Sequence, residues 1–430
     1  MADLTIKPQA GTGNKLIIQD QAGTARVTTS DAGIDIPAVT GNFAAAGNDT
    51  STGNLTVSGD FVPSAPLSNR NIIINGAMQV AQRGNGPATA TGSAGWYQTA
   101  DRMNDFDNCV AANVTRETTN GVLGTETGNT FNDVFPYSWK WASNGTVSSI
   151  PASDRVIFRY RIEGQDVQHL AKGTSVAKAV TLSFWIKSSL TGNLQVNLCD
   201  RTNTRHIGAT YTISAANTWE KKVITFAGDT TGALTNDTAN QLELEWWLTS
   251  GTTYSGGGVP TTWRTNNANE RDQGTIDYVG GSGRTWQITG IQLELGSNVT
   301  PFEHRSFGDE LKRCERYYET IYDADEAVSD EARIGTGVFW KGDQLQVIAP
   351  FRTRKRAVPT FEEIEGTNYY KADRYNSEKL IGAVGSDSNG NTLDRFSIWI
   401  SGGGFSDSIG AVWEMRTNNV NARGAFSAEL

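Results

Sequence analysis

The stretch VTLSFWIKSSLTGNLQVNLCD, residues 180–200, decides the fold class, because apolar and polar side chains alternate in two runs joined by the turn-like segment SSLTGN. A period of two is that of a β-strand with one buried and one wetter face. The stretch therefore predicts two neighbouring strands of an antiparallel sheet. The apolar side chains that share one face are Val180, Leu182, Phe184, Ile186, Leu194, Val196 and Leu198.

The same alternation recurs on both sides of this stretch. It is clear in YSWKWA (137–142), RVIFRYRIEG (155–164) and QLELEWWLTS (241–250). Glycine is frequent, with 46 of 430 residues, and suits the turns between such strands. Short alternating strands separated by turn signals are typical of an all-β sandwich. We therefore predict an all-β protein with a central jelly-roll β-sandwich over residues 68–305.

Three further segments flank the predicted sandwich. Residues 1–67 contain short strand-like runs, such as KLIIQDQAGTARVTT and NLTVSG, but few large apolar residues, and they predict an extended β docking segment that needs a partner surface. Residues 306–332 predict a linking helix, over 306–319, followed by an acidic linker. In the helix Ser306 is the expected N-cap, and Leu311, Cys314 and Tyr318 form the apolar stripe. Alternation then returns and predicts a smaller C-terminal β-domain over 333–430.

Charge and composition argue against several classes of protein. The net charge is −9, and the one basic run, residues 352–356, fits a solvated strand edge or turn better than a nucleic-acid patch, so no nucleic-acid partner is expected. No apolar run has the length of a membrane span, so no membrane insertion is expected. The three cysteines are too sparse for a disulfide framework or a zinc site. Synthesis in a reducing cytosol is the expectation that follows.

Several segments resemble bacteriophage tail-fibre-like appendage proteins with a carbohydrate-binding-module-like jelly roll. They are NRNIIINGAMQVAQRG (69–84), TADRMNDF (99–106), VTLSFWIKSSLTGN (180–193), TWEKKVITFAGDTTG (218–232) and GIQLELGSNVTPFEHRSFGDELKRCERYYE (290–319). The resemblance covers roughly residues 69–319. The family usually reads Asp-Arg-Trp where this chain has Asp101-Arg102-Met103, which puts any role for that aromatic in doubt.

This resemblance implies a structural and recognition role in a virion. It implies a homotrimer that attaches to other tail or adaptor proteins through residues 1–67 and meets host-surface polysaccharide or lipopolysaccharide with its β-domains. Weak sugar sites would suffice, because linked copies raise the apparent affinity. The alternatives are a purely structural head, neck or tail decoration without a ligand and, less favoured, an enzyme that depolymerises polysaccharide.

A glycan site is predicted on the wetter face of the central strands. Sugars dock on flat aromatic rings that are flanked by hydrogen-bonding groups. The residues expected there are Arg159, Trp185, Gln195, Asn197, Glu245 and Trp247. The alternative is that Trp185 and Trp247 pack against another subunit or domain.

The sequence contains only weak indications of a catalytic or metal site. His304 stands between Glu303 and Arg305 without zinc-ligand spacing, so we expect His304 and Arg305 to tie the helix to the sandwich. The loop DSNGNTLD (387–394) places Asp387, Asn389 and Asn391 at alternating positions, which permits a structural calcium ion, but a turn at Asn389-Gly390 explains it equally well. No nucleophile elbow is present, and we expect neither an enzyme nor another cofactor.

Overall fold

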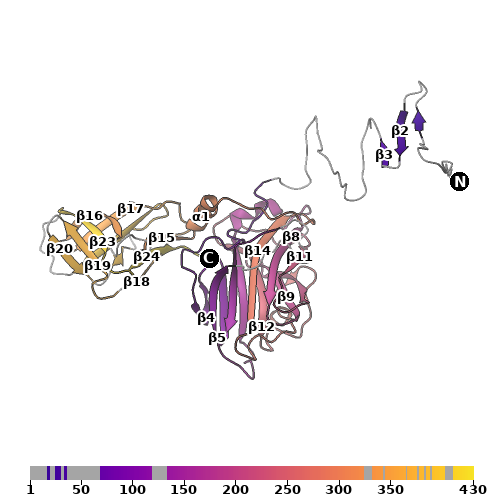
Figure 1. The fold of residues 1–430 in the computed structure, drawn as a ribbon, viewed down its shortest axis with the longest axis horizontal. Coiled ribbons are helices and arrows are strands. Elements are labelled where there is room, and N and C mark those ends of the chain that lie inside the picture. Colours follow the sequence, from indigo (N-terminus) through magenta and orange to yellow (C-terminus); the bar gives the residue numbers. More distant parts are fainter. Residues whose placement is uncertain are drawn as a thin grey trace. The chain divides into compact units, whose positions relative to one another are not determined.

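A computed structural model describes residues 17–19, 25–30, 33–35, 68–118, 133–323, 332–341, 344–364, 366–374, 377–381, 384–387, 390–401 and 410–430. The chain divides into two compact units, Met1–Val62 and Pro63–Leu430. The prediction of an all-β protein with a central sandwich, a short helix and a smaller C-terminal β-domain is confirmed (Figure 1). Within the described residues, no helix is long and apolar enough to cross a membrane.

The described part of the first unit is a three-stranded antiparallel sheet in the order β1-β2-β3. Its strands are β1 (Ile17–Gln19), β2 (Ala25–Ser30) and β3 (Gly33–Asp35). Strand β1 and nearly all of β2 fall in the run KLIIQDQAGTARVTT, where the sequence predicts strands, and β3 follows that run. The other predicted strand of this segment, NLTVSG, lies outside the described residues.

The sandwich is one 11-stranded sheet folded into two layers, with the strand order β11-β8-β14-β6-β5-β7-β12-β9-β10-β13 and with β4 paired to β5. Asn104 to Asp107 of β5 pair with β7, whereas Ala112 to Thr118 pair with β6. Rings from β6 and β7 meet in the core, so β5 passes from one layer to the other. The strands are β4 (Ala88–Tyr97), β5 (Asn104–Thr118), β6 (Tyr137–Ser143), β7 (Arg155–Glu163), β8 (Val180–Ser188), β9 (Gly192–Asp200), β10 (Arg205–Ile213), β11 (Glu220–Phe226), β12 (Asn240–Ser250), β13 (Arg264–Thr265) and β14 (Thr285–Leu295).

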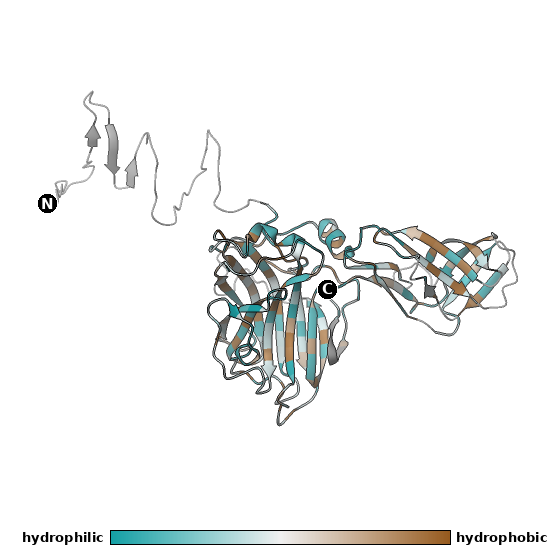
Figure 2. Ribbon diagram, turned by 180° about the vertical axis from the view of Figure 1, so that it is seen from behind, coloured by the Kyte–Doolittle hydropathy of each residue, from teal (hydrophilic) through white to brown (hydrophobic). Residues whose placement is uncertain are grey.

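The core between the two layers is aromatic. The seven apolar residues that define the predicted inner face are all buried in it, and hydrophobic and hydrophilic residues alternate along the strands (Figure 2). Trp139 and Phe158 face each other with ring centroids 4.6 Å apart, and Trp246 lies 5.4 Å from Phe158. Such contacts contribute beyond the area they bury. The inner faces that alternation predicts are therefore correct.

One α-helix, α1 (Phe307–Glu315), follows the last sandwich strand among the described residues. Ser306 caps it by accepting a hydrogen bond from the Asp309 amide at 3.2 Å, as predicted. The predicted end of the helix is wrong, because residues 318–323 form strand β15 (Tyr318–Asp323). Pairing with a distant strand, β24 (Arg423–Ser427), satisfies the backbone there, and helical spacing could not reveal that partner. The acidic stretch 324–331 lies outside the described residues.

The C-terminal part is a second, smaller two-layered structure around its own core, which includes Phe351, Phe396 and Phe426. One layer has the order β15-β24-β18, and the other has the order β20-β19-β23-β16-β17-β22-β21. The strands are β16 (Arg333–Lys341), β17 (Gln344–Pro350), β18 (Thr360–Ile364), β19 (Tyr370–Arg374), β20 (Ser377–Ile381), β21 (Gly385–Ser386), β22 (Arg395–Ser401), β23 (Val412–Thr417) and β24 (Arg423–Ser427).

Buried ion pairs join the sandwich to the C-terminal strands. Glu429, after the last strand, is paired with Arg102 and with Arg83 of the sandwich. The basic run 352–356 lies in the loop between β17 and β18, where Arg352 and Arg354 are exposed, as expected for a solvated turn, whereas Lys355 and Arg356 lie at this junction. Lys355 is buried against Glu319, and the Arg356 guanidinium donates to carbonyl groups of both parts. The charges of Lys355 and Arg356 are therefore engaged by contacts within the chain.

Candidate functional site

Most of the predicted glycan residues do lie together on neighbouring strands. Glu245 of β12 stands opposite Arg159 of β7 on one side and opposite Asn197 of β9 on the other. Trp247 stands opposite Gln195. Alternation therefore assigns the shared face of these five residues correctly.

The expectation that this face is exposed is wrong. Gln195, Asn197 and Trp247 are at most 1% exposed, and Arg159 is 9% exposed. The segment 251–274 lies over them, since Gln195 donates to the Glu270 carbonyl at 2.8 Å and Asn197 donates to the Arg271 carbonyl, also at 2.8 Å. Alternation reports which side of a strand a residue faces, but a loop from elsewhere in the chain can cover that side.

Electrostatics explain why this covered face is stable. Burial alone would raise the pKa of Glu245, but the Arg271 guanidinium, which forms an ion pair with it, holds that pKa well below its ordinary value. Burial and the charge of Glu245 raise the pKa of Glu243. The indole of Trp247 donates to Glu245 at 3.0 Å and packs against Tyr254. The Glu245 carboxylate is thus paired with the Arg271 guanidinium and the Trp247 indole, and the Trp247 ring offers no open platform.

Trp185 is not part of this group. It lies on β8, which four strands (β14, β6, β5 and β7) separate from β12 in the sheet order. It is 0% exposed and packs with Phe135 and Trp219 in a separate cluster. Its partners among the described residues belong to the sandwich itself, so Trp185 neither lies on an open face nor packs against another subunit or domain in this structure. Glycan contact by any of these six residues stays a prediction, and it would require the overlying structure to move.

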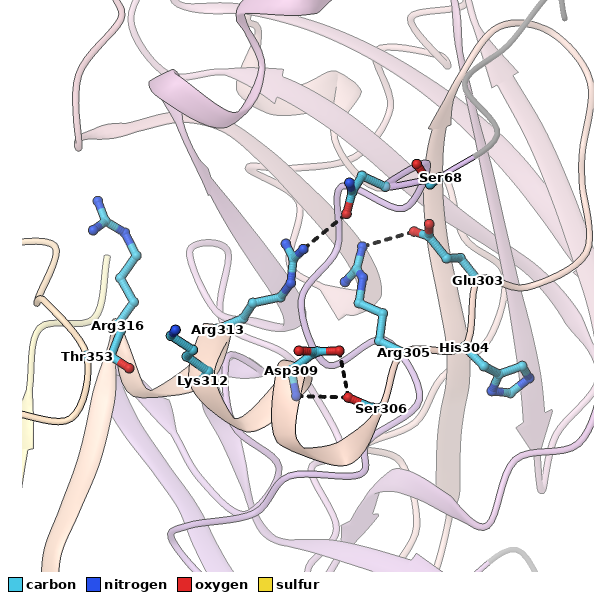
Figure 3. A pocket seen from close by; sticks show the side chains of 11 residues that line it. Ser68, Glu303, His304, Arg305, Ser306, Asp309, Lys312, Arg313, Arg316 and Thr353 are labelled. Carbon is cyan, nitrogen blue, oxygen red and sulfur yellow. Dashed lines mark hydrogen bonds and ion pairs between the residues drawn. The ribbon is translucent and has the colours of Figure 1, made fainter.

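The cleft beside α1 is lined by His304 and by Asp309, Lys312 and Arg313 of the helix, and has a volume of about 600 Å³ (Figure 3). Its cations are largely engaged. The Arg305 guanidinium donates to the Ile73 carbonyl at 3.0 Å and to Glu303 at 3.2 Å, and Arg316 pairs with Glu163. Arg305 thus ties the segment before the helix to the start of the sandwich, as expected. We interpret this cleft as a structural junction.

His304 contributes less to this junction than Arg305 does, because it is exposed. Its ring lies 4.9 Å from that of Phe302 and 5.6 Å from that of Phe135. We expect His304→Ala to lower the free energy of unfolding by about 0.5–1 kcal/mol, the value of such ring contacts, and to leave ligand binding unchanged. Denaturant unfolding and a binding titration check this. Loss of binding at an unaltered melting temperature would contradict it.

The predicted calcium loop is only partly described, since Asn389 lies outside the described residues. Asn391 uses its side chain within the protein: its Oδ1 accepts from the Ser397 amide at 2.9 Å, and its Nδ2 donates to Ser386 at 2.7 Å. Among the described residues, no group of three or more His, Cys, Asp or Glu side chains has a geometry that could hold a metal ion. Calcium binding at this loop stays a prediction.

The strongest candidate site is a groove of about 510 Å³ on the outer face of the C-terminal sheet. Alternation creates it, because each strand of this sheet turns one side chain inward and the next outward. On β16 Phe339 is buried in the core, whereas Trp340 is 64% exposed. The residues that line the groove are Trp340, Gln344, Gln346, Ile348, Ser386, Asp387, Gly390, Arg395, Ser397 and Trp399.

Two indoles and two amides form the groove's centre. Strand β17 lies between β16 and β22, and its Gln346 stands opposite Trp399 of β22. Trp399 lies against Gly385 of the edge strand β21, where an added Cβ would come within 2.3 Å of the indole. The glycine therefore leaves space for the ring, which lies at that position as a half-buried platform.

Hydrogen bonds fix the polar groups of the groove. Gln346 donates through Nε2 to Ser397 Oγ at 2.7 Å, and Ser386 donates to the Ser397 carbonyl at 3.3 Å. Amide and hydroxyl groups held beside an exposed aromatic ring are suited to a ligand that combines apolar faces with hydroxyl groups. The groove therefore has the chemistry that the sequence analysis sought on the sandwich.

The signal that could have found this groove is present in the sequence. The segments GVFWKG (337–342) and RFSIWIS (395–401) each place a tryptophan on the outward side of an alternating run. Trp340 and Trp399 have the same outward position in an alternating run as Trp185 and Trp247. The two pairs differ in whether other parts of the protein cover the tryptophan rings, and the period of a strand does not show this.

Comparisons with known proteins give distant structural likenesses. No family model and no curated protein matches the chain. A tailspike protein 4 enzymatically active domain of bacteriophage CBA120 is 13% identical, with a TM-score of 0.27, and the match covers 52% of this chain but 21% of the tailspike chain. A family 11 carbohydrate-binding module from Clostridium thermocellum is 13% identical over 47% of this chain and 91% of its own, with a TM-score of 0.23. A CBM22 tandem from Paenibacillus barcinonensis is 9% identical over 82% of this chain and 100% of its own, also with a TM-score of 0.23. These values assign no ligand or role to this chain.

Proposed function

We propose that this chain is a recognition protein that binds saccharide through the groove on the outer face of β16, β17 and β22. The observation that carries the proposal is the exposed indole of Trp340, which shares a groove with Trp399 and with the amides of Gln344 and Gln346. Contiguous exposed apolar surface often marks a ligand-binding or assembly site, and Trp340 lies among the exposed side chains of Val338 and Ile348 on adjacent strands. In this proposal the indole stacks on the apolar face of a sugar ring.

The setting that we propose is a phage appendage. It rests on the sequence resemblance of residues 69–319 to tail-fibre-like proteins with a carbohydrate-binding-module-like jelly roll. In this proposal residues 1–67 attach the chain to other virion proteins, the protein is a homotrimer, and the C-terminal groove contacts host-surface glycan. Three linked grooves would raise the apparent affinity of a weak individual site.

Replacing Trp340 with alanine tests the groove. The side chain is mostly exposed, so the melting temperature is expected to stay within about 1–2 °C, since surface substitutions seldom exceed about 0.5 kcal/mol. The dissociation constant for a bound glycan is expected to rise at least about tenfold, which corresponds to about 1.4 kcal/mol. Titration of the full chain, monitored by tryptophan fluorescence, measures the dissociation constants of the natural chain and of Trp340→Ala.

The matched control for this test is Val338→Ala. Val338 is also exposed on the outer face of β16 but does not line the groove. We expect its replacement to leave the dissociation constant unchanged. Equal losses from both substitutions, or no saccharide binding by the natural chain at any tested glycan, would overturn the proposed function.

A second function for the same face is contact between copies of the chain. Val338 and Val412 are exposed on the adjacent strands β16 and β23 and do not line the groove, so apolar surface extends beyond it. Sedimentation of the natural chain and of the Trp340→Ala and Val338→Ala variants distinguishes the two functions. Dissociation of an oligomer by both substitutions would favour the assembly function, the purely structural alternative.

We propose binding without hydrolysis. Polysaccharide hydrolysis by the common mechanism uses two carboxylates about 5–10 Å apart. Among the described residues that line the groove, Asp387 is the single carboxylate. A reducing-sugar assay on each polysaccharide that binds tests this, and product release that Asp387→Asn abolishes would assign the chain to the depolymerase alternative.

A further inference from the structure

The spacing of the two indoles limits the size of the ligand. Trp340 lies on β16 and Trp399 on β22, and β17 is the one strand between them. Adjacent strands are about 4.8 Å apart, so the backbones that bear the two indoles are about 10 Å apart across the sheet. A single sugar ring cannot stack on both, whereas a chain of several rings can.

The strand register sets the direction in which such a chain would run. Val338 stands opposite Gln346, and Gln346 stands opposite Trp399, so these three residues lie at one level. Trp340 lies two residues further along β16, at a register irregularity between Phe339, opposite Leu345, and Lys341, opposite Gln344. A ligand that contacts both indoles therefore crosses β17 obliquely, over the outward amides of Gln344 and Gln346.

The charge of the groove limits the chemistry of the ligand. Arg395 and Asp387 are its two charged residues, and their formal charges cancel. The other polar side chains among the lining residues are the amides of Gln344 and Gln346 and the hydroxyls of Ser386 and Ser397. Amides and hydroxyls match sugar hydroxyl groups as both donors and acceptors. A repeating acidic sugar would bring several carboxylates to a groove with one cation.

We infer that the groove takes an uncharged oligosaccharide longer than a disaccharide, with one sugar ring on Trp340, another on Trp399, and the intervening part over β17. This inference rests on the proposed function and adds the length and charge of the ligand. Trp340 and Trp399 are then two subsites of one site. Gln344 and Gln346 are positioning residues for the segment between them.

An array of unbranched oligosaccharides tests the inference with the full chain. Each neutral oligosaccharide is printed at lengths from one to six rings, beside the counterpart in which uronic acids replace the neutral sugars. We expect binding to neutral chains only, with at least a tenfold rise in affinity between one and four rings. Trp340→Ala is expected to abolish this dependence on length, and Val338→Ala to retain it.

The outcomes separate this inference from the proposed function. Absence of binding to every oligosaccharide, with the fold intact, would overturn the proposed function. Binding of single sugars as tightly as of longer chains, or preference for the uronic-acid series, would leave saccharide recognition standing and overturn the inference. A length dependence that persists unchanged in Trp340→Ala would likewise remove Trp340 as a subsite.

Discussion

Replacing Arg271 with methionine is expected to lower the free energy of unfolding by about 3–5 kcal/mol, the usual cost of removing one partner of a buried ion pair. The Arg271 guanidinium pairs with Glu245, which is 2% exposed, and lies over the indole of Trp247 with 5.3 Å between the guanidinium carbon and the ring centroid. Methionine keeps much of the apolar stem but leaves the Glu245 carboxylate buried without this cation. Denaturant unfolding monitored by tryptophan fluorescence measures the loss.

Two further variants decide whether charge or packing causes the loss. Arg271→Met combined with Glu245→Gln removes both charges, and it should recover more than half of the lost free energy. Arg264→Met changes an arginine of the same covering segment whose side chain is 47% exposed and which pairs with Glu270 at 3.4 Å. An exposed pair of this kind contributes under about 1 kcal/mol. Equal losses in the single and double variants would show that packing dominates.

Replacing Asp105 with asparagine is expected to stabilise the protein near neutral pH. Asp105 is 2% exposed, and neither carboxylate oxygen has a hydrogen-bond partner among the described residues. Burial, with the neighbouring Asp107, raises the pKa of Asp105 to about 7. At pH 8 the folded protein must keep this group protonated or bury its charge. Asparagine has nearly the same shape and carries no charge, so we expect a gain of up to about 4 kcal/mol, since each pKa unit corresponds to 1.36 kcal/mol.

The pH dependence of this gain has a defined sign. In the unfolded chain Asp105 loses its proton near pH 4, whereas in the folded protein its pKa is about 7. Between these values the unfolded chain has already released a proton that the folded protein retains, so stability falls as the pH rises. The advantage of Asp105→Asn should therefore be small at pH 4, grow through pH 6 and level off above pH 7.

Asp107 provides the matched control for this effect. It lies two residues along the same strand, and burial raises its pKa to about 6. However, Asp107 accepts hydrogen bonds from the Cys109 amide at 3.0 Å and from the Trp141 indole at 3.1 Å. Asp107→Asn should therefore stabilise the protein less than Asp105→Asn does. Chemical denaturation at pH 4, 6 and 8 measures all three proteins, and a pH-independent difference for Asp105→Asn would contradict the assignment.

The fold class could be predicted from the sequence because it depends on local periodicity. A strand with one buried face shows its period in six to ten residues, as Val180 to Ile186 do, and the core contains the residues that this period selects. The end of α1 could not be predicted in the same way. Tyr318 continues the helical spacing from Leu311 and Cys314, but it pairs with Ser427, which is 109 positions along the chain.

The type of candidate site, with outward tryptophans, could be predicted from the sequence, but its position in the fold could not. Alternation marks an outward tryptophan equally on β12, where Trp247 is buried, and on β16, where Trp340 is exposed. The difference arises from the segment 251–274, whose Glu270 and Arg271 carbonyls accept from Gln195 and Asn197. That segment has no period of its own, and its glycines predict turns without indicating what they cover. Exposure depends on such long-range contacts, so it required the three-dimensional structure.

The pairing of Glu429 with Arg102 has a consequence for synthesis. The two residues are separated by 327 positions, and the Arg102 side chain is 1% exposed. Domains generally begin to fold on the ribosome before translation ends. During synthesis the sandwich therefore contains Arg102 before its carboxylate partner, Glu429, has been made. The native pairing of Arg102 is reached only after residue 429 has left the exit tunnel. Truncation before residue 429 would leave the buried Arg102 guanidinium without this carboxylate.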